Sequence, residues 1–143
     1  MPWINLLGTS GLARTALDTN ILVRLITRDD PAQLARCEAL LSSVEAVVYP
    51  TVLLETEWVL RRAFRYGRIQ IAESLEGLMA LSGFTIIDAD RVSSALEWFG
   101  AGMDFADALH LAGSSDCDEL VTFDRDFARL AQDAPDAIPV RLL

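Results

Sequence analysis

The amino-acid sequence predicts a single α/β domain with a mainly parallel central sheet flanked by helices. Short β-branched and apolar runs alternate with longer segments whose apolar residues recur at helical spacing. Strands alternating with helices are typical of parallel sheets, because each parallel strand needs a crossover to the next. The length of 143 residues suits one compact domain, and no repeat or linker-like stretch divides it.

The elements are expected in the following order. Residues 14–18 form a first strand, and 20–26 a short helix. A proline then suits the first turn of a second helix over 32–41, since that position needs no N–H donor. The β-branched run 46–49 is the second strand, and the proline after it ends the strand.

A strong helix is expected over 51–65, and a further amphipathic helix over 69–81. Serine and glycine close the latter before a third strand at 84–87. Asp90 is expected to cap a helix over 91–99, because its side chain can accept a hydrogen bond from a free backbone N–H.

The last part of the chain is expected to contain a helix over 104–113, with Asp104 as its N-cap. A strand at 119–123, a short helix at 126–131 and a strand at 138–142 complete the domain. In parallel sheets of this kind ligands bind at the carboxyl ends of the strands.

The composition is that of an ordinary globular protein, with 52% hydrophobic and 23% charged residues. The formal net charge of -9 argues against binding a polyanion through the overall field. Contact with nucleic acid would need local arginines or a bridging metal. All basic residues are arginine, which excludes chemistry that requires lysine. Cys37 and Cys117 are far apart and are expected to be small core residues in a reducing compartment.

The first thirteen residues are expected to be a leader or an alternative start, and residues 14–143 the domain itself. The leader lacks the basic start of a signal peptide. No stretch approaches the roughly 18 apolar residues of a membrane span. We therefore expect a cytoplasmic protein without a membrane partner.

Four carboxylates each interrupt or end an apolar segment: Asp18, Glu55, Asp107 and Asp124. A carboxylate beside a buried strand or helix face is costly unless a partner balances its charge. Four converging carboxylates would repel one another, so a divalent cation is the natural counter-ion. An oxygen-only set favours Mg²⁺ or Mn²⁺ over zinc.

These acidic residues also have simpler explanations. Asp18 could be a helix cap or part of a turn, and near Asp124 the following Asp126 could simply cap the next helix. Glu55 stands between two apolar triplets, so a solvated helix face explains it poorly. Glu57 lies about 200° around the same helix and competes with it, and periodicity does not decide between them.

Asp104, Asp107 and His110 recur every three residues and therefore share one helical face. Asp107 is enclosed by apolar neighbours in sequence, which favours a site over a free surface charge. His110 is the only histidine. A histidine among leucines and alanines is more often a packing residue than a ligand or a base.

Four segments carry a resemblance to a known family: ALDTNILVRLITRDDP, LLETEWVLRRAFRYGR, DFADALHLA and LVTFDRDFARL. In that order they resemble a PIN domain, specifically the VapC-type toxin ribonucleases of bacterial toxin–antitoxin pairs. The resemblance covers nearly everything from Arg14 onward. The leader before Arg14 departs from the family pattern, in which the first strand usually opens the chain.

The resemblance implies an Mg²⁺-dependent endoribonuclease, with Mn²⁺ as a possible substitute. Asp18, Glu55, Asp107 and Asp124 fall on the four acidic metal-site positions, which are also the catalytic ones. Asn20 falls on the polar position of the first motif. Supporting positions around the metal are taken by Asp104, Thr122 and Asp126.

The implied partners are RNA, a cognate antitoxin and a second copy of the chain. Arg61, Arg62, Arg65 and Arg68 could guide RNA to the site, and a solvated helix end explains them equally well. Helices 51–65 and 69–81 carry more apolar surface than one small domain is expected to bury, which favours an interface. That surface includes Trp58, Phe64, Tyr66, Leu75, Leu78 and Met79.

Two other functions compete with this one. A non-catalytic PIN-like binding or regulatory module would keep the fold without turnover. A receiver or haloacid-dehalogenase-like phosphotransfer domain also places an aspartate at a strand end. Both phosphotransfer classes would normally need a late lysine, and the chain has none; the phosphatase would also need a second aspartate where Asn20 stands.

Overall fold

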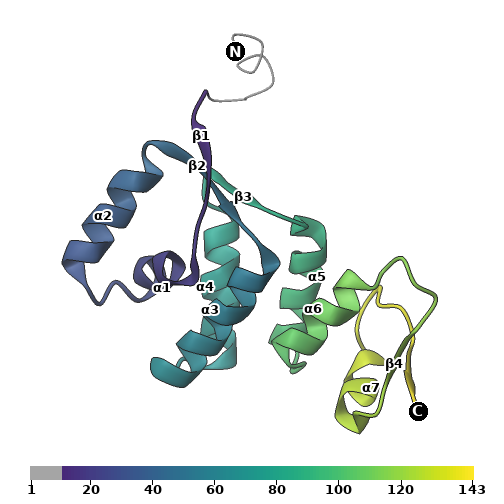
Figure 1. Cartoon of the computed structure of the whole chain (residues 1–143). Helices are drawn as coiled ribbons and strands as arrows, with labels where there is room; N and C mark the ends of the chain where they lie inside the picture. The colour runs from purple at the N-terminus through teal and green to yellow at the C-terminus, as the bar shows by residue number, and fades with distance from the viewer. Residues whose placement is uncertain (1–10) are drawn as a thin grey trace.

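The computed structural model describes residues 11–143, which form five strands and seven helices (Figure 1). The strands are β1 (Ala13–Ala16), β2 (Val44–Val48), β3 (Phe84–Ile86), β4 (Leu120–Thr122) and β5 (Val140–Leu142). The helices are α1 (Thr19–Thr27), α2 (Pro31–Leu41), α3 (Pro50–Ala63), α4 (Arg68–Met79), α5 (Ala89–Gly100), α6 (Phe105–Gly113) and α7 (Arg125–Ala131). Each element expected from the sequence is present, within two residues at either end.

Local signals account for most of the helix ends. Prolines occupy the first turns of α2 and α3, where the missing N–H costs nothing. Asp30 accepts a hydrogen bond from the backbone N–H of Gln33 at 3.0 Å and caps α2. The expected cap of α5 is wrong. Asp88, in the left-handed region with φ 55°, is the N-cap, and Asp90 lies in the first turn.

The α/β class and the parallel strands are confirmed. Strands β1, β2 and β3 form one sheet in the order β1-β2-β3, and both ladders are parallel. Strands β4 and β5 form a second parallel pair. The expected central sheet is therefore divided in two among residues 11–143, because β4 does not join the three-stranded sheet.

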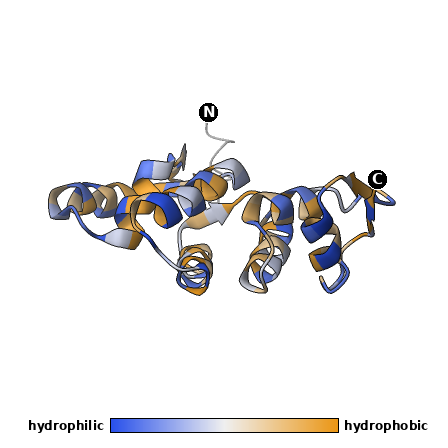
Figure 2. Cartoon of the chain, turned by 90° about the horizontal axis from the view of Figure 1, so that it is seen from below, coloured by the Kyte–Doolittle hydropathy of each residue, from blue (hydrophilic) through white to orange (hydrophobic). Residues whose placement is uncertain are grey.

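The two sheets lie at opposite sides of a helical middle layer. Figure 1 shows α5 and α6 between the three-stranded sheet and the β4 segment, with α3 and α4 next to them. The view from below in Figure 2 shows an elongated outline, with orange, hydrophobic segments at the end that carries the C-terminus. We call the three-stranded sheet with α1 to α4 the first half of the molecule, and α5, α6, α7 with the β4–β5 pair the second half. Contacts between α4 and α5, and between α3 and α6, join the two halves.

One continuous apolar core runs through both halves, from Leu17 to Ala131. It includes Leu75 and Leu78, so the expectation that they add to an exposed apolar surface is wrong. Trp58 of the same set is indeed exposed. Cys37 is buried as expected, whereas Cys117 is exposed, because it lies in the turn after α6 rather than in a packed element.

None of the helices in residues 11–143 combines the length and the apolar character that a membrane crossing requires. Residues 1–10 of the expected leader lie outside the described part of the chain.

Candidate active site

Asp18 follows β1 and begins α1. Its carboxylate accepts a hydrogen bond from the backbone N–H of Thr19 at 2.8 Å, and the residue is exposed. The aspartate therefore acts as the helix cap that its sequence position suggested. The same placement puts a carboxylate at the carboxyl end of a parallel strand, where ligands bind in sheets of this type.

The two glutamates of α3 face in different directions. Glu55 is exposed, whereas Glu57 is only 4% exposed. Oε1 of Glu57 accepts a hydrogen bond from Nε of Arg61 at 2.8 Å. A buried carboxylate that is already paired with a cation stabilises the fold and is not free to bind a ligand. Glu55 is the glutamate that remains available to a ligand.

Three aspartates lie near one another in the second half of the chain. Asp104 caps α6 by accepting from the backbone N–H of Asp107 at 3.1 Å. Asp124 caps α7 by accepting from the backbone N–H of Phe127 at 3.0 Å. Burial raises the pKa of Asp107, and the charges of Asp104 and Asp124 raise it further. Asp107 and Asp124 are therefore close enough to repel each other.

The supporting residues are placed as follows. The hydroxyl of Thr122 accepts from the backbone N–H of Asp124 at 3.0 Å and so helps to fix the start of α7. Asp126 is exposed in the first turn of α7, with its carboxylate 3.4 Å from Arg129. His110 is exposed on α6, so the expectation that it is a packing residue is wrong.

Two of the four arginines around α3 and α4 are occupied by internal contacts. Arg61 pairs with Glu57. Arg68 donates to the backbone carbonyls of Phe99 at 2.8 Å and Met103 at 2.7 Å. Arg62 lies over the ring of Trp58, with its guanidinium carbon 5.8 Å from the centroid. Arg65 is exposed in the turn after α3 with φ 56°. Arg62 and Arg65 are the two that face solvent without a carboxylate among their described contacts.

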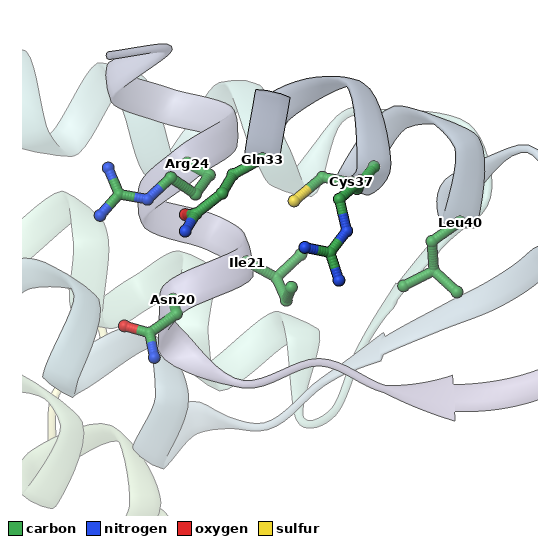
Figure 3. Close-up of a pocket in the computed structure, with 7 residues that line it drawn as sticks. Asn20, Ile21, Arg24, Gln33, Cys37 and Leu40 are labelled. Atoms are coloured by element: carbon green, nitrogen blue, oxygen red, sulfur yellow. The ribbon is translucent and has the colours of Figure 1, made fainter. Parts of the chain in front are cut away.

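A pocket of about 440 Å³ lies between α1 and α2 (Figure 3). Ile21, Cys37 and Leu40 contribute apolar lining, and Asn20, Arg24, Gln33 and Arg36 contribute polar groups. Nη1 of Arg24 pairs with Asp29, whereas its buried Nε has no hydrogen-bond partner among residues 11–143.

Sequence reasoning identified Asn20 but missed Arg24 and Arg36. Their signal was weak, because two arginines on different helices give no pattern until the helices pack together.

Comparison with known families matches residues 15–133 to the PIN domain. The chain belongs to the PIN domain family. Comparison with curated proteins and with solved structures gave no match. The family match covers both halves of the molecule, from β1 to the end of α7. PIN domains are nuclease-type folds, generally RNases, and they typically use divalent metals.

The side chains at the candidate site of this PIN domain are of the kind that bind such a metal. Asp18, Glu55, Asp107 and Asp124 offer carboxylate oxygens, which hard cations prefer. Among residues 11–143, no three acidic, histidine or cysteine side chains come together as a metal site. Asp18 and Glu55 lie on the half formed by α1 and α3, which pack together. Asp107 and Asp124 lie on the other half.

Proposed function

We propose that this PIN domain is a metal-dependent endoribonuclease that acts as the toxin of a VapC-type toxin–antitoxin pair. The observation that carries the proposal is the position of its carboxylates. Asp18 and Asp124 each stand just beyond the carboxyl end of a parallel strand, the place where such sheets bind ligands. Glu55 projects from α3 and Asp107 from α6, and neither forms an ion pair with an arginine among the described contacts of residues 11–143; the one charge that lowers the pKa of Asp107 is that of His110.

Asp18, Glu55, Asp107 and Asp124 are the proposed catalytic and metal-binding residues, and Mg²⁺ or Mn²⁺ the proposed cofactor. Asp107 supports this assignment, because a half-buried carboxylate near two others gains most from a nearby cation. Asn20, Asp104, Thr122 and Asp126 are proposed to support these residues. No other nucleophile competes, since the sequence offers neither a Ser-His-Asp nor a Cys-His arrangement.

RNA is the proposed substrate. In a chain with a net charge of -9, a polyanion needs local cationic groups. Arg62 and Arg65 at the end of α3 are two such groups. Arg36 of the α1–α2 pocket is a third, and Asn20, which follows Asp18 closely in sequence, lines the same pocket.

The deciding experiment measures cleavage of a defined RNA by metal-free protein to which Mg²⁺ or Mn²⁺ is returned. Activity should appear with the metal and be lost in excess EDTA, and the melting temperature should rise, because a ligand that binds the native state stabilises it. Asp18→Asn, Glu55→Gln, Asp107→Asn and Asp124→Asn should each lower the rate about 100-fold or more.

The matched control is Glu76→Gln, since Glu76 is an exposed glutamate of α4 away from the site. Glu57→Gln is unsuitable, because its burial against Arg61 makes it a packing change. Undiminished cleavage in EDTA, or full activity of Asp18→Asn, would refute the metal-dependent mechanism. RNA binding without cleavage at any metal concentration would favour the alternative of a regulatory PIN module.

The toxin role is tested separately in cells. Induction of the wild-type chain in a bacterial host should arrest growth, and induction of the Asp124→Asn variant should not. Co-expression of the gene product encoded immediately upstream should relieve the arrest if it is the antitoxin. We further propose that the antitoxin carries a basic tail, which the acidic protein should bind faster at low salt than at high salt.

A further inference from the structure

One face of helix α3 lies open to solvent. Glu55, Trp58 and Arg62 stand three and four residues apart, so they project from the same side of the helix. All three are exposed, and Trp58 keeps 53% of its surface open. The opposite side of the helix is buried. We name these three residues, together with the exposed Arg65 that follows the helix, the α3 stripe.

The two arginines of the α3 stripe keep their positive charge free. Most arginines of the chain pair with a carboxylate, and Arg61, next to Arg62 in sequence, pairs with Glu57. Arg62 and Arg65 form no ion pair among residues 11–143. The chain has a net charge of -9, so carboxylates are in excess elsewhere on it. Two neighbouring guanidinium groups that no carboxylate neutralises attract an anion from outside the chain.

The indole of Trp58 adds a flat aromatic surface to these charges. The guanidinium carbon of Arg62 lies 5.8 Å from the centroid of the indole ring, a cation–π contact. An open aromatic face beside arginines is the combination with which proteins bind single-stranded nucleic acid. Unpaired bases stack on the ring, and the arginines contact the phosphates. The α3 stripe therefore offers one group for a base and two groups for the backbone of the same strand.

The α3 stripe begins at a residue of the candidate active site. Glu55 is one of its four carboxylates, and Arg62 lies about 10 Å further along the helix axis, at about 1.5 Å per residue. That length corresponds to about three stacked nucleotides at about 3.4 Å each. A strand that lies along the α3 stripe therefore passes from the arginines over the indole to Glu55.

We propose that the α3 stripe binds a single-stranded segment of RNA, with one unpaired base stacked on Trp58 and the neighbouring phosphates held by Arg62 and Arg65. The base on Trp58 then belongs to a nucleotide close to the one that reaches Glu55. A fully paired duplex does not fit, because its bases are stacked within the helix and cannot turn onto the ring. Delivery of the strand to a cleavage site rests on the function proposed above, whereas binding of the strand does not.

Binding is measured without cleavage, on metal-free protein in excess EDTA, with a short fluorescein-labelled uridine oligoribonucleotide. Trp58→Ala should weaken binding about ten-fold or more, and Trp58→Phe should keep most of it, because a phenyl ring still stacks. Arg62→Gln should lower by about one the slope of log affinity against log salt, since one phosphate contact is lost. Leu81→Ala and Arg28→Gln, at exposed positions outside the α3 stripe, are the controls and should change nothing. Unchanged binding by Trp58→Ala overturns the proposal.

Acrylamide quenching of tryptophan fluorescence identifies what covers the ring. All proteins carry Trp3→Phe, so that emission comes from Trp58 and from Trp98, which is only 5% exposed. Trp58→Phe gives the signal of Trp98 alone. Addition of the oligoribonucleotide should protect Trp58 from acrylamide. Protection that instead grows with protein concentration and does not respond to RNA would show that a second copy of the chain covers the α3 stripe, and it would overturn the proposal.

Cleavage kinetics separate this proposal from the proposed function. In a chain that cleaves RNA with metal, Trp58→Ala should raise KM about ten-fold and change kcat little, because the stacked base is held equally in the ground state and the transition state. A chain that binds the oligoribonucleotide through Trp58 and does not cleave it would support the α3 stripe and refute the proposed function alone. A chain that cleaves RNA equally well with Trp58→Ala would refute the α3 stripe alone.

Discussion

Asp107 is a carboxylate that favours binding of a cation but lowers the stability of the cation-free fold. It is half-buried on α6, and both its burial and the neighbouring Asp104 and Asp124 raise its pKa. A raised carboxylate pKa means that the folded chain binds the proton more tightly than the unfolded chain does. The ionised form therefore opposes folding at neutral pH, and this penalty disappears as the pH falls below the ordinary value of 3.8.

Asp107→Asn should accordingly raise the melting temperature at neutral pH in the absence of metal. The increase should be small, about 1–2 °C, because the group is largely solvated and its repulsions are screened. The difference from wild type should shrink as the pH approaches 4, near the ordinary pKa of aspartate. Thermal unfolding monitored by circular dichroism at several pH values measures both effects.

The exposed Glu76→Gln variant is the control, and it should leave the melting temperature unchanged at each pH. A lower melting temperature for Asp107→Asn at neutral pH would contradict the repulsion argument. It would mean that packing around the side chain outweighs the charge.

At the scale of elements, one arginine of α4 makes hydrogen bonds across the contact between the two halves. Arg68 was a candidate for guiding RNA, yet its guanidinium donates to the carbonyls of Phe99 and Met103 and lies 4.8 Å from the centroid of the Phe99 ring. These carbonyls belong to the C-terminal end of α5 and the turn after it, where helix carbonyls lack internal partners. Arg68 therefore holds α4 against the end of α5.

Arg68→Gln should destabilise the fold by about 1–2 kcal/mol, because it removes two charge-assisted hydrogen bonds and a cation–π contact. Arg62→Gln is the matched control, since Arg62 contacts only the exposed ring of Trp58 in the described structure and should change stability little. Urea unfolding gives the free energy of unfolding of both variants. Equal values for the two would show that Arg68 does not stabilise the contact between α4 and α5.

The elements themselves could be predicted from sequence because their limits are set locally. Prolines, capping aspartates and apolar spacing placed the strands and helices within two residues of their observed ends. The division into two sheets could not be predicted, since strand partners are chosen by packing between residues distant in sequence. The same limit applies to the site: strand ends indicated Asp18 and Asp124, but periodicity could not show that Glu57 is buried and Glu55 exposed.

For the whole molecule, the decisive property is that its two parts, one with the three-stranded sheet and one with the β4–β5 pair, form an elongated outline (Figures 1 and 2). The family match spans both parts, so the fold includes every carboxylate of the proposed site. The hydrophobic core also spans both parts. Within residues 11–143, β4 pairs with β5 and does not join β1. Folding of one chain and pairing of two chains into the expected homodimer are separate events, and only the pairing depends on protein concentration.

The expected homodimer should make the melting temperature rise with protein concentration, because the dimer contains two native chains that unfold together. At the dissociation constant of the dimer about half of the chains are paired, so the increase should begin near that concentration. Thermal unfolding over a range of protein concentrations, with light scattering at matching concentrations, tests the prediction. A monomeric mass at micromolar protein, with a melting temperature that does not depend on concentration, would contradict the expected homodimer.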